Sequence, residues 1–168
     1  MKLFIDSDGT LFCWQKNVSL DEVVKPGYFR DLDIYENVVR GIKMFSERNP
    51  DVEIYIATHV LNYSHIIMDK KQAFQQNIPF IKPNHIIYIP YGISKADYIA
   101  NIDKDCYLLD DYSKNLESWK DASGRIIKLV NDINSIPNDE NYIHYDWPAW
   151  MICQHLEEII KGEEKTYV

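Results

Sequence analysis

The feature that most constrains the fold is the N-terminal stretch KLFIDSDGTLF, residues 2–12. Its apolar run, residues 3–5, stops abruptly at a pair of acids, Asp6 and Asp8, followed by Gly9. A short apolar run followed by Asp and Gly predicts a buried strand that ends in a turn. Carboxylates placed together at a strand end repel one another unless a cation lies between them. Because ligands bind at this end of the strands in an open α/β sheet, the pattern predicts a site for a divalent metal and a phosphoryl group.

Apolar runs of strand length alternate with amphipathic segments along the rest of the chain. Further strands are expected at residues 52–57, 85–89, 106–109 and 125–130. Helices are expected at residues 34–48, 62–77 and 94–102, between Ser113 and Ser123, and at residues 148–160. Asp33, Ser94 and Ser113 each precede one of these helices and are of the residue types that cap helix N-termini.

Strands that alternate with helices predict a parallel sheet with helices on both faces. We therefore expect a Rossmann-like, three-layer α/β/α fold with a mainly parallel sheet of about five strands. No repeat or Pro/Gly-rich linker divides the chain, so one domain over residues 1–168 is expected. Within it, residues 11–32 would form a loop or lid, and residues 141–168 would carry the C-terminal helix.

Polar side chains follow the predicted strands at three places. These are Asp6 with Asp8, Thr58, and the adjacent acids Asp110 and Asp111. The ends of parallel strands share one edge of the sheet, so these groups are expected to converge. Thr58 could donate to a phosphoryl oxygen without adding charge, or it could satisfy backbone groups at the strand end. The acids at 110 and 111 could bind a metal, or they could stabilise the start of a helix through its dipole.

These stretches resemble motifs of the haloacid dehalogenase (HAD) superfamily of phosphohydrolases. The first motif, DxDGT, is complete in residues Asp6, Asp8, Gly9 and Thr10. The stretch IYIAT, ending at Thr58, resembles the second motif, and DDYSKN, residues 110–115, resembles the DDxxxN form of the fourth. The resemblance covers roughly residues 2–131 and implies a HAD fold with a minimal cap.

The superfamily's third motif is a lysine between the third and fourth strands, and three lysines compete for it. Lys95 follows the third strand at the start of a helix that leads to the acidic strand, which matches the family's order. Lys82 precedes the third strand, and Lys104 lies in a polar turn. Lys95 is therefore the predicted member.

The resemblance implies a Mg²⁺-dependent phosphatase. Asp6 would be the nucleophile and form an aspartyl-phosphate. Asp8 would protonate the leaving group and then activate the hydrolytic water. The metal would be held by Asp6, by the backbone carbonyl of Asp8, and by Asp110 or Asp111, directly or through water.

Other motif residues would hold the phosphoryl group. Thr58 and Lys95 would bind its oxygens. Gly9 would allow a sharp turn so that backbone N–H groups of the loop, including that of Thr10, face the phosphate. Asn115 would brace the loop that carries the second pair of acids.

Two segments resemble the 5′(3′)-deoxyribonucleotidase branch of the superfamily, namely PGYFRDL (residues 26–32) and DDYSKN. Enzymes of that branch dephosphorylate nucleoside monophosphates and carry a helical cap after the first motif. Here only residues 11–32 are available, so a reduced cap and a more open site are expected. The open site would also suit a phosphorylated polynucleotide end or a protein.

Aromatic residues of this segment are candidates for substrate contacts. Trp14, Tyr28 and Phe29 could stack on a base, and His59 could contact substrate. Alternatively, the three aromatics fix the loop to the core and the histidine is incidental. In the C-terminal part, Tyr142, Tyr145, Trp147 and Trp150 are expected to pack the last helix on the sheet, with a homodimer contact as the alternative.

Composition excludes several classes of protein. A net charge of −8 argues against a general nucleic-acid binder, which needs a basic face. Cys13, Cys106 and Cys153 have no metal-ligand spacing, so a zinc site is not expected. We expect them to be reduced thiols of a cytoplasmic protein. The sequence shows no signal peptide and no apolar run long enough to span a membrane.

The leading hypothesis is thus a phosphatase of small phosphomonoesters, such as (deoxy)nucleoside monophosphates. One alternative is a phosphatase of polynucleotide ends, and transfer of the phosphoryl group to an acceptor other than water is another. A non-catalytic HAD-like binding protein is the alternative from a different class, and it would be expected to lack Asp6 or Asp8.

Overall fold

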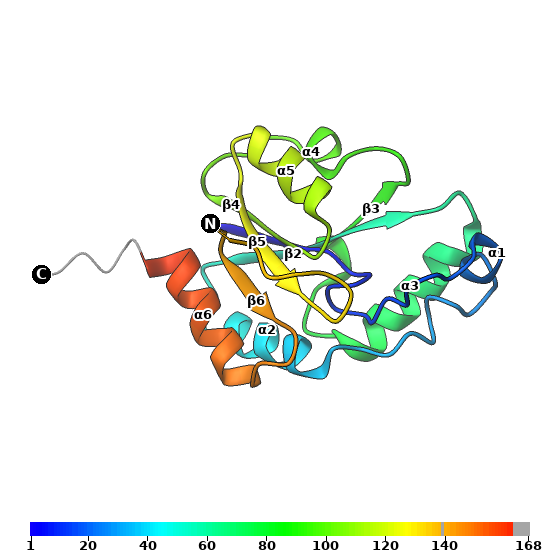
Figure 1. Cartoon of the computed structure of the whole chain (residues 1–168), viewed down its shortest axis with the longest axis horizontal. Helices are drawn as coiled ribbons and strands as arrows, with labels where there is room; N and C mark the ends of the chain where they lie inside the picture. Colours follow the sequence, from blue (N-terminus) through cyan, green and yellow to red (C-terminus); the bar gives the residue numbers. More distant parts are fainter. Residues whose placement is uncertain (139, 163–168) are drawn as a thin grey trace, which may run out of the picture.

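A six-stranded sheet forms the centre of the molecule, between two layers of helices (Figure 1). The computed structural model describes residues 1–138 and 140–162. The strands lie in the order β3-β2-β1-β4-β5-β6, and the neighbouring pairs are parallel. Their bounds are β1 (Lys2–Ile5), β2 (Glu53–Val60), β3 (Ile86–Pro90), β4 (Cys106–Asp110), β5 (Arg125–Val130) and β6 (Tyr142–His144). The expected parallel, Rossmann-like sheet is confirmed, with six strands instead of about five.

The helices cover both faces of the sheet, as expected (Figure 1). On one face lie α4 (Lys95–Tyr98) and α5 (Ser113–Asp121). On the other lie α2 (Glu36–Arg48), α3 (Ser64–Asn77) and α6 (Ala149–Lys161). A short helix, α1 (Leu20–Val23), belongs to the segment after the first motif, and a 3-10 turn, η1 (Pro83–His85), precedes β3.

Successive side chains of β1 point to opposite faces of the sheet and so into two separate parts of the core. Leu3 and Ile5 pack with the buried faces of α2, α3 and α6, whereas Phe4 packs with Trp119 of α5 on the other side. This period-2 pattern is the reason that a strand buried on both faces reads as a continuous apolar run. The sheet is therefore held from both sides, and its carboxyl edge is left to carry polar groups.

The sixth strand lies in the segment that was expected to hold only the C-terminal helix. β6 pairs with β5, with Lys128 opposite Tyr142 and Val130 opposite His144. The helix that follows, α6, begins after Pro148 and is C-capped by Gly162, close to the expected bounds. The last residues of the expected segment, 163–168, and residue 139 of the expected domain lie outside the described residues.

The predicted cap of the first helix is wrong. Tyr35, not Asp33, occupies the N-cap position of α2, and it makes no side-chain capping hydrogen bond. The physical reason is a tertiary contact, because Phe12 and Ile34 form an antiparallel bridge and Tyr35 N–H donates to Leu11 C=O over 2.8 Å. These contacts hold the chain extended where the local pattern favours a helical start.

The other two predicted caps differ in outcome. Ser94 caps α4 as expected, although α4 is a single turn and shorter than the predicted 94–102 helix. Ser113 is the first residue of α5 instead of its cap, which is Tyr112. The Ser113 hydroxyl instead accepts a hydrogen bond from Lys128 Nζ over 2.9 Å.

The segment after the first motif forms a small cap, as expected. Its one helix, α1, is capped by Ser19, and α3 holds the segment in place. Gly27 N–H donates to the buried carboxylate of Asp69 over 2.6 Å, and His65 bonds the carbonyl of Val24 over 2.7 Å. Gly27 has φ +89°, a conformation that glycine adopts at no steric cost. The cap therefore packs on α3 as a fixed element.

Among residues 1–138 and 140–162, no helix has the length and apolar character needed to cross a membrane. The three cysteines are free.

Candidate active site

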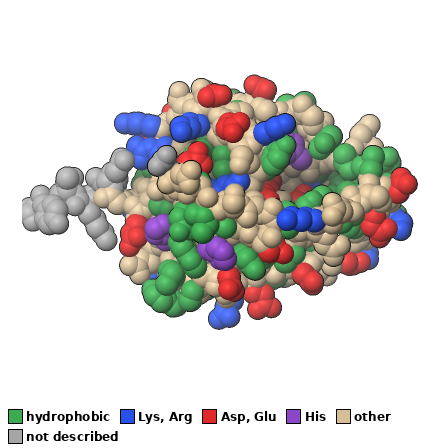
Figure 2. All heavy atoms as spheres, viewed as in Figure 1, with side chains coloured by type: hydrophobic (Ala, Val, Ile, Leu, Met, Phe, Trp, Pro, Cys, Tyr) green, Lys and Arg blue, Asp and Glu red, His purple; other side chains and the backbone are tan. Residues whose placement is uncertain are grey.

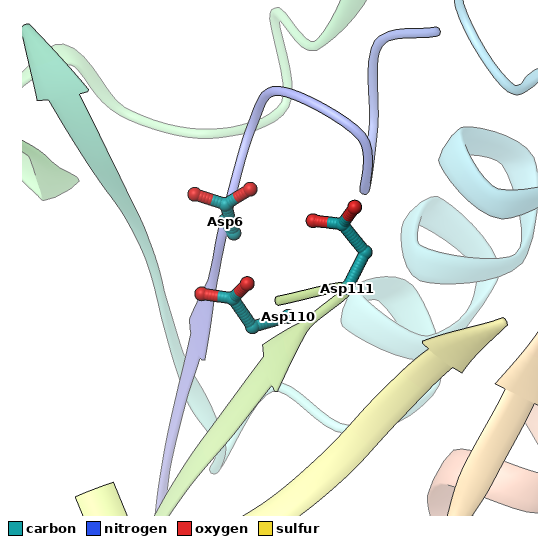
Figure 3. A group of neighbouring side chains, drawn as sticks. All are labelled: Asp6, Asp110 and Asp111. Atoms are coloured by element: carbon teal, nitrogen blue, oxygen red, sulfur yellow. The ribbon is translucent and has the colours of Figure 1, made fainter. Parts of the chain in front are cut away.

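Three carboxylates meet where β1 and β4 end. These strands are neighbours in the sheet, with Ile5 opposite Leu109, so Asp6 and Asp110 leave the sheet side by side. One carboxylate oxygen from each of Asp6, Asp110 and Asp111 lies within 4.8 Å of the others. Figure 3 shows the three side chains around one point at the strand ends. The convergence that was inferred from strand order is present in the structure.

Lys95 pairs with two of these acids. Its Nζ lies 2.5 Å from Asp6 Oδ1 and 2.6 Å from Asp110 Oδ2, and its side chain is fully buried. Burial lowers the pKa of Lys95, but Asp110 and Asp6 raise it further, so the net pKa lies above its ordinary value. Lys95 is therefore a fixed positive charge. The two lysines that competed for this role in the sequence, Lys82 and Lys104, are exposed and belong to no such cluster.

The first-motif loop holds the remaining acid. The Thr10 hydroxyl lies 3.3 Å from Asp6 Oδ2 and 3.5 Å from Asp111 Oδ1, and it accepts a hydrogen bond from Asp111 N–H over 3.2 Å. Gly9 has φ +88°, and a Cβ there would lie 2.4 Å from Asp111 Oδ2. Only glycine fits this contact, because both the backbone angle and the space exclude a side chain.

Burial and mutual repulsion raise the pKa values of Asp6 and Asp111. Burial raises the pKa of Asp6 well above its ordinary value, Lys95 opposes the shift, and Asp110 and Asp111 add to it. Burial, with the charge of Asp110 next, raises the pKa of Asp111 to about 6. Asn131 counteracts part of this shift by donating to Asp111 Oδ2 over 3.2 Å. If all three acids are ionised, Lys95 leaves two negative charges uncompensated.

This donor set fits a divalent, oxygen-preferring cation such as Mg²⁺. The ligand atoms are carboxylate oxygens, they lie close together, and their excess charge matches that of one divalent ion. Asp6, Asp110 and Asp111 would hold it. The Asp8 carboxylate is not in this group, because it forms an ion pair with Lys70; the role predicted for Asp8 at the metal involves its backbone carbonyl.

Lys70 is the main feature that sequence reasoning missed. It lies on α3 with its side chain 2% exposed, paired with the Asp8 carboxylate. Its Nζ donates to Thr58 Oγ1 over 2.8 Å and lies 3.3 Å from Ser7 Oγ, which is itself 2.6 Å from Thr58 Oγ1. The same ammonium lies 4.4 Å from the centre of the Phe29 ring. A signal was available, since Lys70 falls four residues after Ile66 and four before Phe74, on the buried stripe of the helix.

A cavity of about 380 Å³ opens over the acids, and we refer to it as the catalytic cavity. Four carboxylates and six other residues line it: Asp6, Asp8, Asp110, Asp111, Trp14, His59, Tyr91, Tyr112, Asn115 and Ile133. Thr58, Lys95, Gly9 and Thr10 are not among its lining residues, and all but Gly9 have no exposed surface. The structure thus places Thr58 and Lys95 beside the acids, with their polar groups bonded inside the protein.

Some of the remaining candidate residues line the catalytic cavity, and others pack away from it. Asn115 donates to Asp110 Oδ2 over 2.9 Å. His59 lines the catalytic cavity, and its Nε2 bonds the carbonyl of Ile93 over 2.8 Å. Tyr28 and Phe29 pack on one another with ring centres 5.2 Å apart, and neither lines the cavity.

Trp14 both packs on the other cap aromatics and lines the catalytic cavity. It contacts the Tyr28 and Phe29 rings at 6.1 Å and 6.3 Å between centres, and one side of it faces the cavity.

Two further side chains support the site and were not predicted. Asn131 donates to the carbonyl of Gly9 over 2.8 Å, and Lys128 donates to the carbonyl of Asp111 over 2.5 Å. Both follow from the position of β5 beside β4, which no local pattern reveals.

Comparison with known proteins supports a relationship by sequence. No family model matches the chain. It is 30% identical over 105 residues to a Staphylococcus epidermidis protein described as "Putative 5′(3′)-deoxyribonucleotidase", covering 62% of this chain and 52% of that protein. A Staphylococcus aureus protein of the same description is 28% identical over 117 residues, covering 68% and 58%. The chain thus spans about half the length of the curated relatives it matches.

Solved structures show the fold. A D,D-heptose 1,7-bisphosphate phosphatase from B. bronchiseptica, complexed with magnesium and phosphate, aligns with a TM-score of 0.63 at 11% identity, over 95% of this chain and 99% of that one. A HAD family hydrolase from Deinococcus radiodurans, with bound phosphate and sodium, aligns with a TM-score of 0.60 at 10% identity, over 99% and 98%. The chain thus has the fold of HAD family hydrolases, and its first-strand motif and sequence relatives are similar to members of the haloacid dehalogenase (HAD) superfamily.

Proposed function

We propose that the protein is a Mg²⁺-dependent phosphomonoester hydrolase that acts through a phosphorylated Asp6. The observation that carries the proposal is the arrangement at the catalytic cavity. Asp6 reaches its wall beside two further acids, and Asp8 lines the same cavity two residues along the loop. A nucleophile, a proton donor and a cation site therefore meet at one point that a phosphate ester can reach.

In the first half of the reaction, a carboxylate oxygen of Asp6 attacks phosphorus, and the bond from phosphorus to the ester oxygen breaks. Asp8 gives its proton to the departing alkoxide. In the second half, Asp8 takes a proton from water, which attacks the phosphoryl group and releases inorganic phosphate and free Asp6. Mg²⁺, when bound, would offset the negative charge of the carboxylates and the phosphoryl oxygens.

Each of the two proposed catalytic acids is paired with a buried lysine. Lys95 opposes the effect of burial on the pKa of Asp6, which favours the ionised form needed for attack. Lys70 holds the Asp8 carboxylate in place and links it to Thr58 and Ser7. Entry of a dianionic phosphate into this network would give both ammonium groups a further negative partner.

The proposed substrates are small phosphomonoesters, with nucleoside monophosphates as the first class to test. The sequence relatives carry the description of 5′(3′)-deoxyribonucleotidases, which supports this class. Polynucleotide ends are less favoured, because the chain has a net charge of −8. On the side of the molecule that Figure 2 shows, lysines and arginines are scattered among acidic side chains. A non-catalytic role is disfavoured because both Asp6 and Asp8 line the cavity.

The test is release of inorganic phosphate from a panel of phosphomonoesters, with Mg²⁺ and with chelator. We expect turnover with Mg²⁺, loss of turnover with chelator, and loss of at least about 10³-fold in Asp6→Asn because the nucleophile is removed. Asp105→Asn is the matched control, since Asp105 is an exposed aspartate at the opposite end of β4. Undiminished turnover in Asp6→Asn, or no metal-dependent turnover across the panel, would disprove the proposal.

A further inference from the structure

The catalytic cavity continues into a second cavity of about 550 Å³, which we refer to as the outer cavity. The two share four lining residues, namely His59, Tyr91, Tyr112 and Asn115. Lys114 and Ser118 of α5 line the outer cavity only. Because the shared residues form a common wall, a molecule with its phosphoryl group at Asp6 can extend its leaving group into the outer cavity.

Two of the shared residues are exposed aromatic side chains. Tyr91 is 74% exposed and Tyr112 is 53% exposed. Their backbones are fixed, since Tyr91 N–H donates to Val60 C=O over 2.9 Å and Tyr112 N–H donates to Asp110 Oδ1 over 2.9 Å. Each ring is thus held at a strand end next to the acids, with most of its surface open to a ligand.

The aromatic residues of the small cap are less suited to bind a ring. Phe29 is 6% exposed and lies under the ammonium of Lys70, and Tyr28 packs edge-on against it. The Tyr28 hydroxyl is buried, with no hydrogen-bond partner among the described residues. These rings already pack against one another, so a ligand ring would have to displace packed side chains.

A third cavity, of about 710 Å³, adjoins the catalytic cavity on the side of β5 and β6 and shares Trp14 and Ile133 with it. Its lining includes three acids, Glu36, Asp132 and Asp146, and one lysine, Lys16. Among the described residues that line the outer cavity none is acidic, and Lys114 adds a positive charge. A dianionic phosphomonoester is therefore expected to approach Asp6 from the side of the outer cavity, because the lining of the third cavity carries a net negative charge.

We propose that the aromatic ring of the substrate's leaving group binds in the outer cavity against Tyr91 and Tyr112, and that these tyrosines select nucleoside-like phosphomonoesters over aliphatic ones. This inference rests on the proposed phosphatase function. Base–aromatic stacking accepts any base because each has a π-face, so the wall selects a ring system more than one particular base. Asn115 and Ser118 also line the outer cavity and offer polar groups to a sugar or similar spacer.

The test compares kcat/KM for thymidine 5′-monophosphate with kcat/KM for glycerol 3-phosphate, which has no ring. We expect the ratio of the two to fall about tenfold in Tyr91→Ala and in Tyr112→Ala, the size of one lost stacking contact. Tyr112→Phe should keep most of the ratio because it keeps the ring. Tyr63→Ala is the control, since Tyr63 is 48% exposed and lines neither cavity, and its ratio should equal that of the wild type.

Each outcome decides the inference. A ratio within twofold of wild type in both alanine variants would overturn it, as would a fall in Trp14→Ala alone, which would assign the ring to the cap. If the wild type hydrolyses neither ester, the phosphate-release panel decides the proposed function and the following binding measurement decides the inference. Binding of thymidine 5′-monophosphate to Asp6→Asn, measured by calorimetry with Mg²⁺, provides a second readout. The Kd should rise about tenfold when Tyr91→Ala is added to that variant.

Discussion

Lys70 of α3 donates to the hydroxyl of Thr58 on β2 over 2.8 Å, and the same ammonium pairs with the Asp8 carboxylate. One buried cation thus fixes the second-motif threonine and the proposed proton donor together. We predict that Lys70→Met lowers kcat for phosphomonoester hydrolysis by about 10²-fold, because a preorganised charge beside the reacting groups is lost. Steady-state kinetics with Mg²⁺ measures the effect.

Lys71→Met is the control for this prediction, since Lys71 is exposed on the same helix. It should leave kcat within about twofold of wild type. If Lys70→Met and Lys71→Met have the same kcat, Lys70 plays no part in the reaction and serves only to pack α3.

Lys95 gives a prediction about stability. Lys95→Met removes the cation between two buried acids, Asp6 and Asp110. Loss of one partner of a buried ion pair costs about 3–5 kcal/mol in the free energy of unfolding. We expect this loss in chelator, and a partial recovery in Mg²⁺, because bound metal stabilises the folded state. Denaturant unfolding in the two buffers measures both effects. Lys104→Met, at an exposed lysine, should change neither, and equal stability of the two variants would contradict the prediction.

The positions of the strand ends could be predicted because long apolar runs fix them, and strand order then brings Asp6 and Asp110 together. Lys95 was identified through the resemblance, which implies a lysine after the third strand, and the structure places its ammonium beside Asp6 and Asp110. Lys70 could not be found by that route, because its partners Asp8, Ser7 and Thr58 lie in other segments, and only tertiary packing brings them to α3. Its position on the buried stripe was the one local signal.

Two other errors have a similar cause. The Asp33 cap failed because Phe12 pairs with Ile34, a contact between segments that local propensity does not describe. β6 was missed because a three-residue strand is too short to show alternation, and it exists through its pairing with β5. Tertiary contacts decided the outcome in each case, as they commonly do against weak local preferences.

Asp111 gives a prediction about pH. In the metal-free protein its pKa is raised from an ordinary value of 3.8 to about 6, so the folded state binds a proton that the unfolded state releases between pH 4 and 6. Stability falls with rising pH where the folded state binds more protons. In chelator, the free energy of unfolding should therefore fall from pH 4.5 to 6.5, and it should fall less in Asp111→Asn.

Thermal unfolding in chelator across this pH range checks the sign, with Asp121→Asn at an exposed site as the control. At pH 7 in chelator, Asp111→Asn should be more stable than the wild type, because a repulsive carboxylate is removed. In Mg²⁺ the order should reverse, since the variant loses a metal ligand. The same pH slope in Asp111→Asn and wild type would rule out this source of the dependence.

The small cap provides the last prediction. The buried carboxylate of Asp69 accepts the Gly27 N–H over 2.6 Å and so ties residues 13–32 to α3. Asp69→Ala leaves that N–H without its acceptor, which costs about 1–3 kcal/mol when the group stays buried. The cap should respond by opening locally, so hydrogen exchange of the amides in residues 20–31 should speed up at least tenfold, with little change in the strands of the sheet. Asp21→Ala, at an exposed acid of the same segment, should leave exchange unchanged. A uniform increase across the sheet would show that Asp69 supports the whole fold, and no increase would show that the remaining contacts of α3, such as His65 with Val24, hold the cap by themselves.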